Sequence, residues 1–331
     1  MFSPPRFFAV PMNPSVTIAD LRAAETRIRG MVRRTPVLTS STLDERAGAR
    51  LFFKCENLQK AGVFKARGAH NAVFALSDGE AASGVLTHSS GNHGAALALA
   101  ARRRGIPAHI VVPEGAAAIK VEAIRRYGGR VVFCAPTLAA RAAAAARIHE
   151  ETGARLIHPY DNPLIVAGQG TAALELLEEV PDLQAVIAPV GGGGLLSGTA
   201  IAAKSLSPTV RVFGAEPDGA DDAARSLRAG RLIPQDDPRT IADGLRTSLG
   251  EITFPLLQRW LDDVITVSEE SIVEAMLLVW QVMKIIIEPS SAVAVAAVLK
   301  ADGPLQGLRV GVILSGGNVD LTRLPWTNSR G

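Results

Sequence analysis

The sequence is poor in cysteine and in long apolar runs. Its two cysteines, Cys55 and Cys134, lie in strand-like runs at no ligand spacing, so we expect buried thiols in a reducing compartment and no disulfide framework. No apolar run reaches the length of a membrane span, and residues 1–13 hold three prolines without a continuous apolar segment. We therefore expect a cytoplasmic protein with neither a membrane anchor nor a secretory signal.

The sequence also lacks a large excess of charge of either sign. Its 35 basic and 32 acidic residues leave a net charge of +3, and the basic side chains are spread along the chain apart from short arginine clusters. This distribution argues against a nucleic-acid partner. The length of 331 residues, with 47% hydrophobic and 20% charged residues, indicates a soluble globular protein built from two lobes.

Runs typical of β-strands alternate with helical runs along most of the chain. A first helix is expected over Ile18–Met31, with Pro36 beyond it. The strand-like runs are 51–55, 85–88, 108–112, 130–133, 155–158, 185–190, 210–215, 264–267 and 309–314, and helical stretches include 95–104, 118–127, 138–151 and 165–178. Near-continuous apolar strands between helices predict an α/β fold whose parallel sheets are covered on both faces. Ligands of such folds gather beyond the carboxyl ends of the strands.

One lysine occupies a conspicuous place in this pattern. The chain has only seven lysines against 28 arginines, and Lys65 follows Phe64 directly, after a loop that contains Gly62. Helical spacing starts behind it, so Lys65 is expected at or just before a helix N-terminus. An amine there could hold a carbonyl cofactor as a Schiff base. For a lone lysine, a solvated helix end would be the more common role.

A polar stretch at residues 87–94 also follows a predicted strand and opens a helix. Its small residues can present backbone N–H groups to an anion. Asn92 could donate its amide to a phenolate oxygen, and Ser90 could offer a hydroxyl to a reacting carbon. Ordinary helix capping by Ser89 or Ser90 is the alternative, although capping alone does not require the two glycines and the Asn-His pair.

Two glycine-rich stretches follow further predicted strands. Four glycines, Gly191 to Gly194, allow a close approach to a phosphate group. They match neither a P-loop nor a dinucleotide fingerprint, so a phosphate cup for a smaller cofactor fits better, with a tight turn as the alternative. Ser315 precedes two more glycines, and its hydroxyl would ordinarily be satisfied by backbone.

In combination, these motifs resemble the fold-type II pyridoxal-phosphate enzymes, a two-lobed α/β fold like that of the tryptophan synthase β subunit. The resemblance is greatest to serine racemases and single-module threonine/serine dehydratases and covers residues 34–320. It implies mostly parallel, twisted sheets covered by helices. The expected large, cofactor-binding domain comprises residues 1–80 and 163–331, and the expected small, substrate-loop domain comprises residues 81–162. Family members are commonly dimers, so a homodimer is expected.

The resemblance also implies roles for individual residues. Lys65 would hold pyridoxal phosphate, Asn92 would bond its ring oxygen and Ser315 would face its pyridine nitrogen. The cofactor-binding set implied in full is Phe64, Lys65, Asn92, Gly191, Gly192, Gly193, Gly194, Leu195, Gly244 and Ser315. The substrate would be held by Ser89, Ser90, Asn92, His93 and Arg141, the last matching an arginine that swings toward the substrate.

An acidic segment after another predicted strand suggests a cation site. Two carboxylates and a backbone carbonyl form an oxygen-only ligand set, which suits Mg²⁺ or a similar ion such as Ca²⁺ or Mn²⁺. In the family the matching positions are Glu216, Ala220 (through its carbonyl) and Asp222. The alternative is an acidic helix cap that complements the helix dipole.

The resemblance predicts an L-threonine/L-serine ammonia-lyase. Lys65 would remove the α-proton, and β-elimination of the hydroxyl would yield a 2-oxo acid and ammonia. The alternatives are a serine racemase, with Ser90 as the acid on the opposite face, and a 3-hydroxyaspartate dehydratase; racemisation could also be a side activity. A non-catalytic binder of the cofactor and a β-replacement synthase are weaker alternatives, because Lys65, Ser90, Asn92 and Ser315 occur together.

Three positions bear on how far the resemblance extends. Val63 stands where the family usually has a small residue such as serine, which removes a possible polar contact near the cofactor. Ala95 replaces a glutamine that helps to hold an activating nucleotide, whereas Tyr127 of the same site is present, so nucleotide activation stays open. No regulatory module is expected after Asp320.

Overall fold

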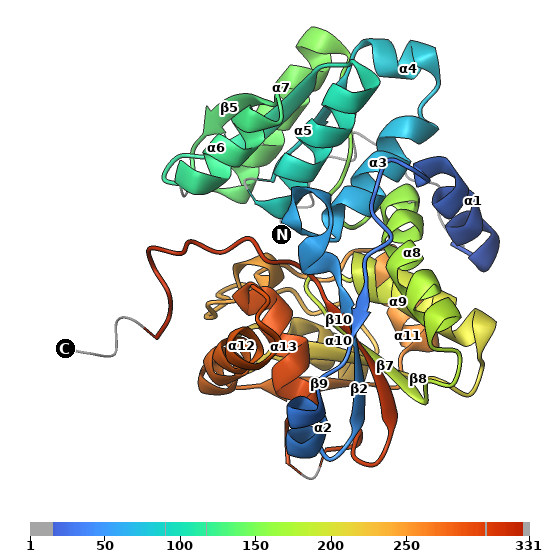
Figure 1. The fold of residues 1–331 in the computed structure, drawn as a ribbon. Helices are drawn as coiled ribbons and strands as arrows, with labels where there is room; N and C mark the ends of the chain where they lie inside the picture. Colours follow the sequence, from blue (N-terminus) through green and yellow to red (C-terminus); the bar gives the residue numbers. More distant parts are fainter. Residues whose placement is uncertain (1–15, 90, 117, 302, 327–331) are drawn as a thin grey trace.

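The chain folds around two separate β-sheets (Figure 1). The computed structural model describes residues 16–89, 91–116, 118–301 and 303–326. We call the six-stranded sheet with its helices the large lobe, and the four-stranded sheet with α4 to α7 the small lobe. No helix within the described ranges is long and apolar enough to cross a membrane.

The sheet of the large lobe is assembled from both ends of the chain. Its strand order is β1-β2-β10-β7-β8-β9, and all neighbours are parallel except β1 and β2. The strands are β1 (Val37–Leu38), β2 (Arg50–Cys55), β7 (Ala185–Pro189), β8 (Arg211–Pro217), β9 (Asp263–Val267) and β10 (Arg309–Leu314). Since parallel strands end at the same edge, the segments after β7, β8 and β10 are brought together.

The sheet of the small lobe comes from one continuous stretch of chain. Its order is β5-β4-β3-β6 and every pair is parallel. The strands are β3 (Val85–Thr87), β4 (Ala108–Pro113), β5 (Arg130–Cys134) and β6 (Arg155–Leu156). Helix α5 packs on one face with α3, and α7 covers the other face.

Helices cover both faces of the large sheet as well. Helices α8 and α9 share one apolar core with β7 and β8, whereas α12 and α13 share the other with β2 and β10. The helices are α1 (Ile18–Ile28), α2 (Ser41–Ala47), α3 (Lys65–Ala75), α4 (Asp78–Ala82), α5 (Asn92–Arg104), α6 (Ala118–Arg126), α7 (Leu138–Thr152), α8 (Pro163–Glu179), α9 (Gly194–Leu206), α10 (Asp222–Ala229), α11 (Thr253–Trp260), α12 (Glu269–Met283) and α13 (Pro289–Val298).

Most helix ends follow from local sequence. The side chain of Asn162 accepts hydrogen bonds from the backbone of Leu164 and Ile165, and Pro163 occupies the first position of α8. Left-handed glycines such as Gly105 and Gly153 end α5 and α7. Short 3₁₀ turns, among them η1 (Glu56–Leu58), η2 (Lys60–Gly62), η3 (Asp218–Ala220) and η4 (Asp243–Leu245), connect elements at the carboxyl edge of the sheet.

The structure confirms all nine predicted strands and corrects three details. Helix α1 ends at Ile28 instead of Met31, because Gly30 has a left-handed φ of 74°. The two-residue strand β1 has no predicted counterpart. Cys55 is buried as expected, but Cys134 is only half-buried, because it lies on β5 at the edge of the small sheet.

Candidate active site

Lys65 is the first residue of α3, as its sequence context predicts. Its amine is buried and donates a hydrogen bond of 2.7 Å to the carbonyl oxygen of Pro159. The ring of Phe64 lies beneath it, 5.0 Å from Nζ. Burial lowers the pKa of Lys65 to about 8, against the opposing field of Glu288. At pH 7 an amine with this pKa is mainly protonated, with roughly a tenth present as the free base.

The end of β10 lies against the lysine segment. The backbone N–H of Phe64 donates to the carbonyl of Ser315 over 2.9 Å, and Val63 forms a β-bridge with Gly316. Ser315 is only 2% exposed, and its hydroxyl has no protein partner among the described residues. Val63 is fully buried, so the position where the family usually has a small residue is apolar here.

The four glycines form a tight loop between β7 and α9. Gly193 has a φ of 88°, which side chains rarely adopt, and Gly194 begins α9. Within the described chain, the N–H groups of Gly191, Gly192 and Gly193 donate to no other protein group. Leu195 follows in the core. The loop therefore presents free backbone donors beside a helix N-terminus, as an anion site requires.

Tyr160 covers this loop and connects it with the lysine. A Cβ atom on Gly192 would lie 2.2 Å from the Tyr160 ring, so only glycine permits this contact. The ring packs edge-on against His158, with centroids 4.6 Å apart, and the intervening Pro159 receives the bond from Lys65. Burial lowers the pKa of His158 to about 3, so its imidazole is neutral.

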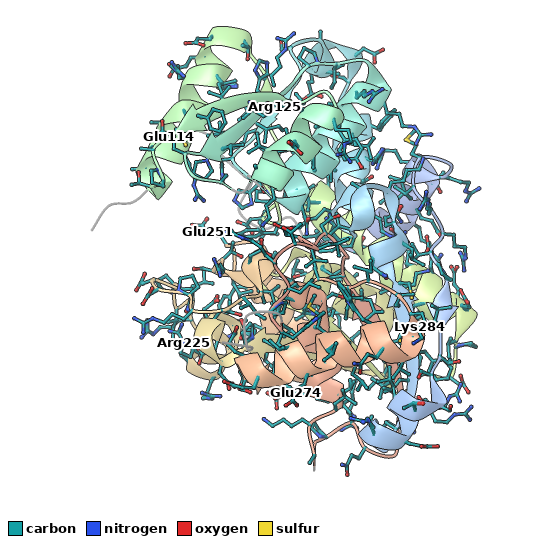
Figure 2. The ribbon with its side chains drawn as sticks, turned by 60° about the vertical axis from the view of Figure 1, so that its left-hand side comes forward. Glu114, Arg125, Arg225, Glu251, Glu274 and Lys284 are labelled. Carbon is teal, nitrogen blue, oxygen red and sulfur yellow. The ribbon has the colours of Figure 1, made fainter. Side chains whose placement is uncertain are left out.

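The loop is braced from behind by the N-terminus of α11. Thr253 donates its hydroxyl to the carbonyl of Gly192 over 2.8 Å. Asp161 in turn accepts backbone hydrogen bonds from Glu251, Ile252 and Thr253. Figure 2 shows Glu251 at the boundary between the two lobes.

Asn92, the first residue of α5, bridges the two lobes. Its amide nitrogen donates to both carboxylate oxygens of Glu288, at 2.9 and 3.1 Å, and its amide oxygen accepts from Nδ2 of Asn318 at 2.9 Å. Glu288 also borders the end of β10, because a Cβ on Gly316 would lie 2.8 Å from its Oε1. Asn92, Ser315 and Lys65 are thereby grouped around one space.

The remaining predicted substrate residues are less closely placed. His93 is buried, its Nε2 lies 3.2 Å from the carbonyl of Ile157, and burial holds its pKa well below the usual value. Ser89 lies half-buried between β3 and α5, and Ser90 lies outside the described residues. Arg141 on α7 is half-buried, and its Nε is a buried donor without a partner.

Gly244 lies in η4, beside the glycine loop. Its N–H donates to the hydroxyl of Ser290, and its carbonyl lies 3.1 Å from where a Cβ on Gly191 would be. The neighbouring Asp243 forms an ion pair with Lys120 of α6, so this turn also contacts the small lobe.

The predicted cation residues form a buried acidic pair. Glu216 at the end of β8 accepts backbone hydrogen bonds from Ala223 and Ala224, and Asp222 accepts one from Leu249. Oδ1 of Asp222 is buried without a partner. Burial together with the neighbouring carboxylates raises the pKa of Glu216 to about 8, and burial raises that of Asp222 to about 6. These buried oxygens fit a divalent cation.

Side chains alone would not complete that cation site. No cluster of three His, Cys, Asp or Glu side chains suited to a metal ion occurs in the described part of the chain. An ion here would need backbone carbonyls, such as that of Ala220, or water in addition to the two carboxylates.

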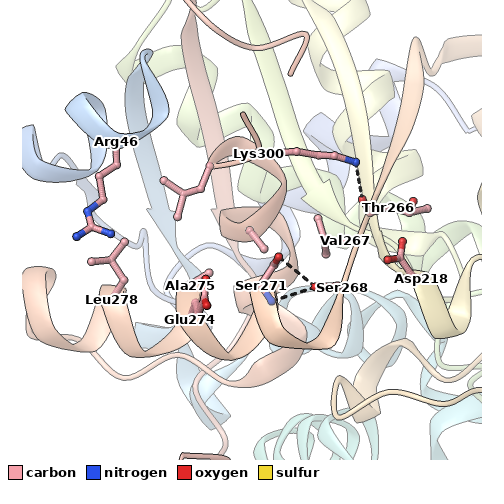
Figure 3. Close-up of a pocket in the computed structure, with 12 residues that line it drawn as sticks. Arg46, Asp218, Thr266, Val267, Ser268, Ser271, Glu274, Ala275, Leu278 and Lys300 are labelled. Carbon is pink, nitrogen blue, oxygen red and sulfur yellow. Dashed lines mark hydrogen bonds between the residues drawn. The ribbon is translucent and has the colours of Figure 1, made fainter. Parts of the chain in front are cut away.

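A surface cavity of 520 Å³ lies away from this site, between α12, α13 and α2 (Figure 3). Figure 3 shows Arg46 near one end and Asp218 near the other. Its described lining contains none of the predicted cofactor residues. The cavity therefore adds nothing to the site around Lys65.

Comparisons with known proteins agree with this geometry. A family model described as "Pyridoxal-phosphate dependent enzyme" matches residues 28–316. The chain belongs to the pyridoxal-phosphate-dependent enzymes. It is 50% identical to a β-hydroxyaspartate dehydratase of Paracoccus denitrificans, over 94% of this chain and 98% of that protein. Maize serine racemase superposes with a TM-score of 0.92 at 48% identity, covering 95% and 97% of the two chains. A threonine deaminase of T.th. superposes with a TM-score of 0.88 at 48% identity, covering 93% and 100%.

The residues of this pyridoxal-phosphate enzyme fit the cofactor. The glycine loop offers three unused backbone donors for a phosphate, Lys65 offers an amine with a lowered pKa, and Ser315 offers an unpartnered hydroxyl. The predicted fold-type II architecture is confirmed by the similarity to the maize racemase and the threonine deaminase. The exact domain boundaries stay a prediction.

Sequence reasoning missed several residues at the site. Glu288 stands before Pro289 and an apolar helix, so in sequence it resembles an ordinary acidic helix cap. Asn318 and Tyr160 lie in segments that resemble the family, but no spacing marked either of them as a partner of the site.

Proposed function

We propose that the protein is a pyridoxal-phosphate-dependent ammonia-lyase that dehydrates L-threonine and L-serine to 2-oxo acids and ammonia. The observation that carries this proposal is the neutral, unpartnered Ser315 hydroxyl at the end of β10. A hydroxyl does not hold a pyridine nitrogen in its protonated form as a carboxylate would. The nearby carboxylate, Glu288, is engaged with Asn92. The site therefore favours prompt β-elimination over a long-lived carbanion.

The residues of the chain have distinct tasks in this reaction. When bound, pyridoxal phosphate supplies an electron sink that acidifies the α-C–H bond of an attached amino acid. The glycine loop holds the phosphate, and residues 89–93 hold the substrate carboxylate. Lys65, released as a free base, accepts the α-proton, and the carbonyl of Pro159 orients its amine. Neutral His93 and His158 line the space without competing for that proton.

The test is one incubation series of the purified holoenzyme. L-Threonine and L-serine are supplied separately, and 2-oxo acid, ammonia and D-amino acid are measured in the same samples. Abundant 2-oxo acid with little D-serine is expected. An amount of D-serine equal to or above that of pyruvate would overturn the assignment in favour of a racemase.

A second candidate is dehydration of 3-hydroxyaspartate. Two observations favour it: the similarity to the Paracoccus denitrificans dehydratase, and the unpartnered Nε of Arg141, which could receive a second carboxylate. The incubation series therefore includes L-threo-3-hydroxyaspartate. A kcat/KM for this substrate far above that for serine, and lost in Arg141→Ala, would assign the site to the dicarboxylic substrate.

Racemisation is the alternative that depends on Ser90. A second acid on the opposite face is needed to return a proton from that side, and the sequence offers Ser90 for this task. Ser90→Ala should remove any formation of D-serine and spare dehydration of the L-enantiomer. Equal loss of both activities would show that Ser90 is not an acid specific to one face.

Three accessory features complete the proposal. Mg²⁺, or Ca²⁺ or Mn²⁺ in its place, would bind at Glu216, the carbonyl of Ala220 and Asp222, and the buried oxygens there support it. A homodimer is supported by exposed Leu58 and Ile286, which lie on segments joined by a hydrogen bond from Asn57. The free thiol of buried Cys55 supports a cytoplasmic location. Light scattering of the purified protein tests the dimer.

A further inference from the structure

Glu288 is a fully enclosed carboxylate with an unusual set of partners. It precedes α13, and its two oxygens accept from Asn92 on the small lobe and from the backbone N–H of Asn318 at 3.1 Å. No described cation forms an ion pair with it; the charged groups that lower its pKa through their field are Lys120 of α6 and Lys65 of α3. Asn92 is 196 residues from Glu288 in sequence, so this contact exists only because the fold brings the two lobes together.

The same contact determines which way the Asn92 amide faces. The ionised carboxylate of Glu288 can only accept hydrogen bonds, so it faces the donor Nδ2 of Asn92. Asn318 donates to Oδ1 of Asn92 from the other side. A flipped amide would bring Oδ1 against two carboxylate oxygens and Nδ2 against another NH₂ group. Asn318 is itself fixed, because its Nδ2 also donates to the carbonyl of Ala61 over 2.8 Å.

One hydrogen of Nδ2, directed between the two carboxylate oxygens, accounts for both distances of 2.9 and 3.1 Å. The second hydrogen of Nδ2 then remains available. We propose that Glu288 is a positioning residue, which fixes the Asn92 amide so that this second N–H faces the ring oxygen of the cofactor. The inference rests on the part of the proposed function that places Asn92 beside that oxygen.

A purely structural role does not account for a carboxylate here. Burial raises the pKa of Glu288 to about 7, so keeping it ionised in this place is unfavourable. A glutamine would avoid the charge, but its amide would place an N–H against either Nδ2 of Asn92 or the N–H of Asn318. Only a group that accepts at both oxygens satisfies the two donors together.

The test is the absorbance of the holoenzyme, which reports the hydrogen bonding of the cofactor's ring oxygen through its tautomeric bands. Glu288→Gln should shift the balance between these bands and lower kcat/KM by about tenfold, as loss of a group that orients another typically does. Glu269→Gln is the matched control, because this half-buried carboxylate accepts from the backbone of Ile241 and does not touch Asn92. It should leave the bands unchanged.

A double-mutant cycle separates positioning from an independent effect. If Glu288 acts through Asn92, Glu288→Gln should change neither the bands nor kcat/KM further in an Asn92→Ala background. Additive effects, or wild-type bands in Glu288→Gln, would overturn the inference. Should Glu288→Gln fail to fold, Asn318→Ala is measured in its place and must shift the balance between the bands. Unchanged bands in Asn318→Ala would overturn the inference. The bands require the cofactor but no particular substrate, so a wrong substrate assignment would leave this test intact.

Discussion

Two buried charge clusters lie on either side of the start of α3 and differ in how their charges are balanced. In the first, Arg67 binds Glu56 and Glu175 at 2.7 Å each, and Lys54 binds Glu175 at 2.7 Å. Burial opposes ionisation there, but Arg67 and Lys54 outweigh it and lower the pKa of Glu175. In the second, Lys65 and Glu288 form no ion pair with any residue that the structure describes, and their pKa values lie at about 8 and about 7.

The difference shows how one helix can serve both stability and chemistry. Residues two apart on a helix point to different sides, so Lys65 and Arg67 face separate environments. Arg67, paired with Glu56 and Glu175, holds its charge over a wide pH range, which suits a group that joins α3 to η1 and α8. Unpaired buried groups titrate near neutral pH, which suits a site where protons must move.

The largest expected effect comes from breaking the unpaired cluster. Lys65→Ala should abolish turnover by several orders of magnitude and remove the imine absorbance, because no other amine can replace it. Spectra and steady-state rates of purified protein supplied with cofactor measure both. Lys60→Ala, in the same loop, is the control and should keep colour and activity. A Lys65→Ala variant that stays yellow and active would contradict the assignment.

Breaking the paired cluster should instead destabilise the fold. Glu175→Gln leaves Arg67 and Lys54 undercompensated in the interior and should lower the free energy of unfolding by about 3–5 kcal/mol. Urea unfolding measures this loss. Glu178→Gln on the same helix removes partly exposed ion pairs with Arg22 and Arg34, and about 0–1 kcal/mol is expected. Similar losses in both variants would show that the buried ion pairs of Glu175 contribute no more to stability than the partly exposed ion pairs of Glu178.

The acidic pair of Glu216 and Asp222 offers an intermediate case, in which an ion would supply the missing charge. Mg²⁺ at about 100 times its Kd should stabilise the protein by about 2.7 kcal/mol. Thermal unfolding with and without chelator measures this shift. Asp222→Asn should abolish it, whereas Asp218→Asn, exposed in the same loop, should retain it. A shift that persists in Asp222→Asn would place the ion elsewhere.

A smaller effect concerns the pH dependence of stability. Because the pKa of Glu288 is raised from 4.5 to about 7, the folded state binds its proton more tightly than the unfolded state. The stabilisation that Glu288 gives the folded state by binding this proton is fully present below pH 4.5 and is lost as the pH rises through about 7. The free energy of unfolding of Glu288→Gln, compared with that of the wild type, should therefore increase by about 1–3 kcal/mol as the pH rises from 5 to 8.

This measurement needs a constant background from neighbouring groups. The charges of Lys65 and Lys120 lower the pKa of Glu288, and the pKa of Glu216 is raised like that of Glu288. Cofactor and Mg²⁺ are therefore kept at saturating concentrations at every pH. Glu269→Gln again serves as the control. A stability difference between Glu288→Gln and wild type that is independent of pH would contradict the raised pKa.

Much of the fold could be predicted from sequence, because its signals are local. Apolar runs indicate the strands, and α3 begins at Lys65 as its spacing predicts. The two-residue strand β1 is too short to carry a periodic pattern and exists only through pairing with β2. The end of α1 was missed because Gly30 ends it ahead of Pro36.

The candidate site could be proposed from the sequence only where a motif carries its own chemistry. Lys65, the glycine loop and Ser315 follow strands and stand out by residue type. Glu288 does not, because its partner Asn92 is 196 residues away and nothing near either residue marks the contact. Asn318 is likewise 226 residues from Asn92. Such contacts depend on the docking of two lobes, which local patterns do not encode.

The strand order also bears on how the protein is made. The small sheet uses residues 85–156 and can form while synthesis continues, whereas β10 must insert between β2 and β7. Ser315 meets Phe64 only after that insertion. The candidate cofactor pocket can therefore close only after residues 309–315 have been synthesised, and a chain truncated before residue 309 would lack both β10 and Ser315.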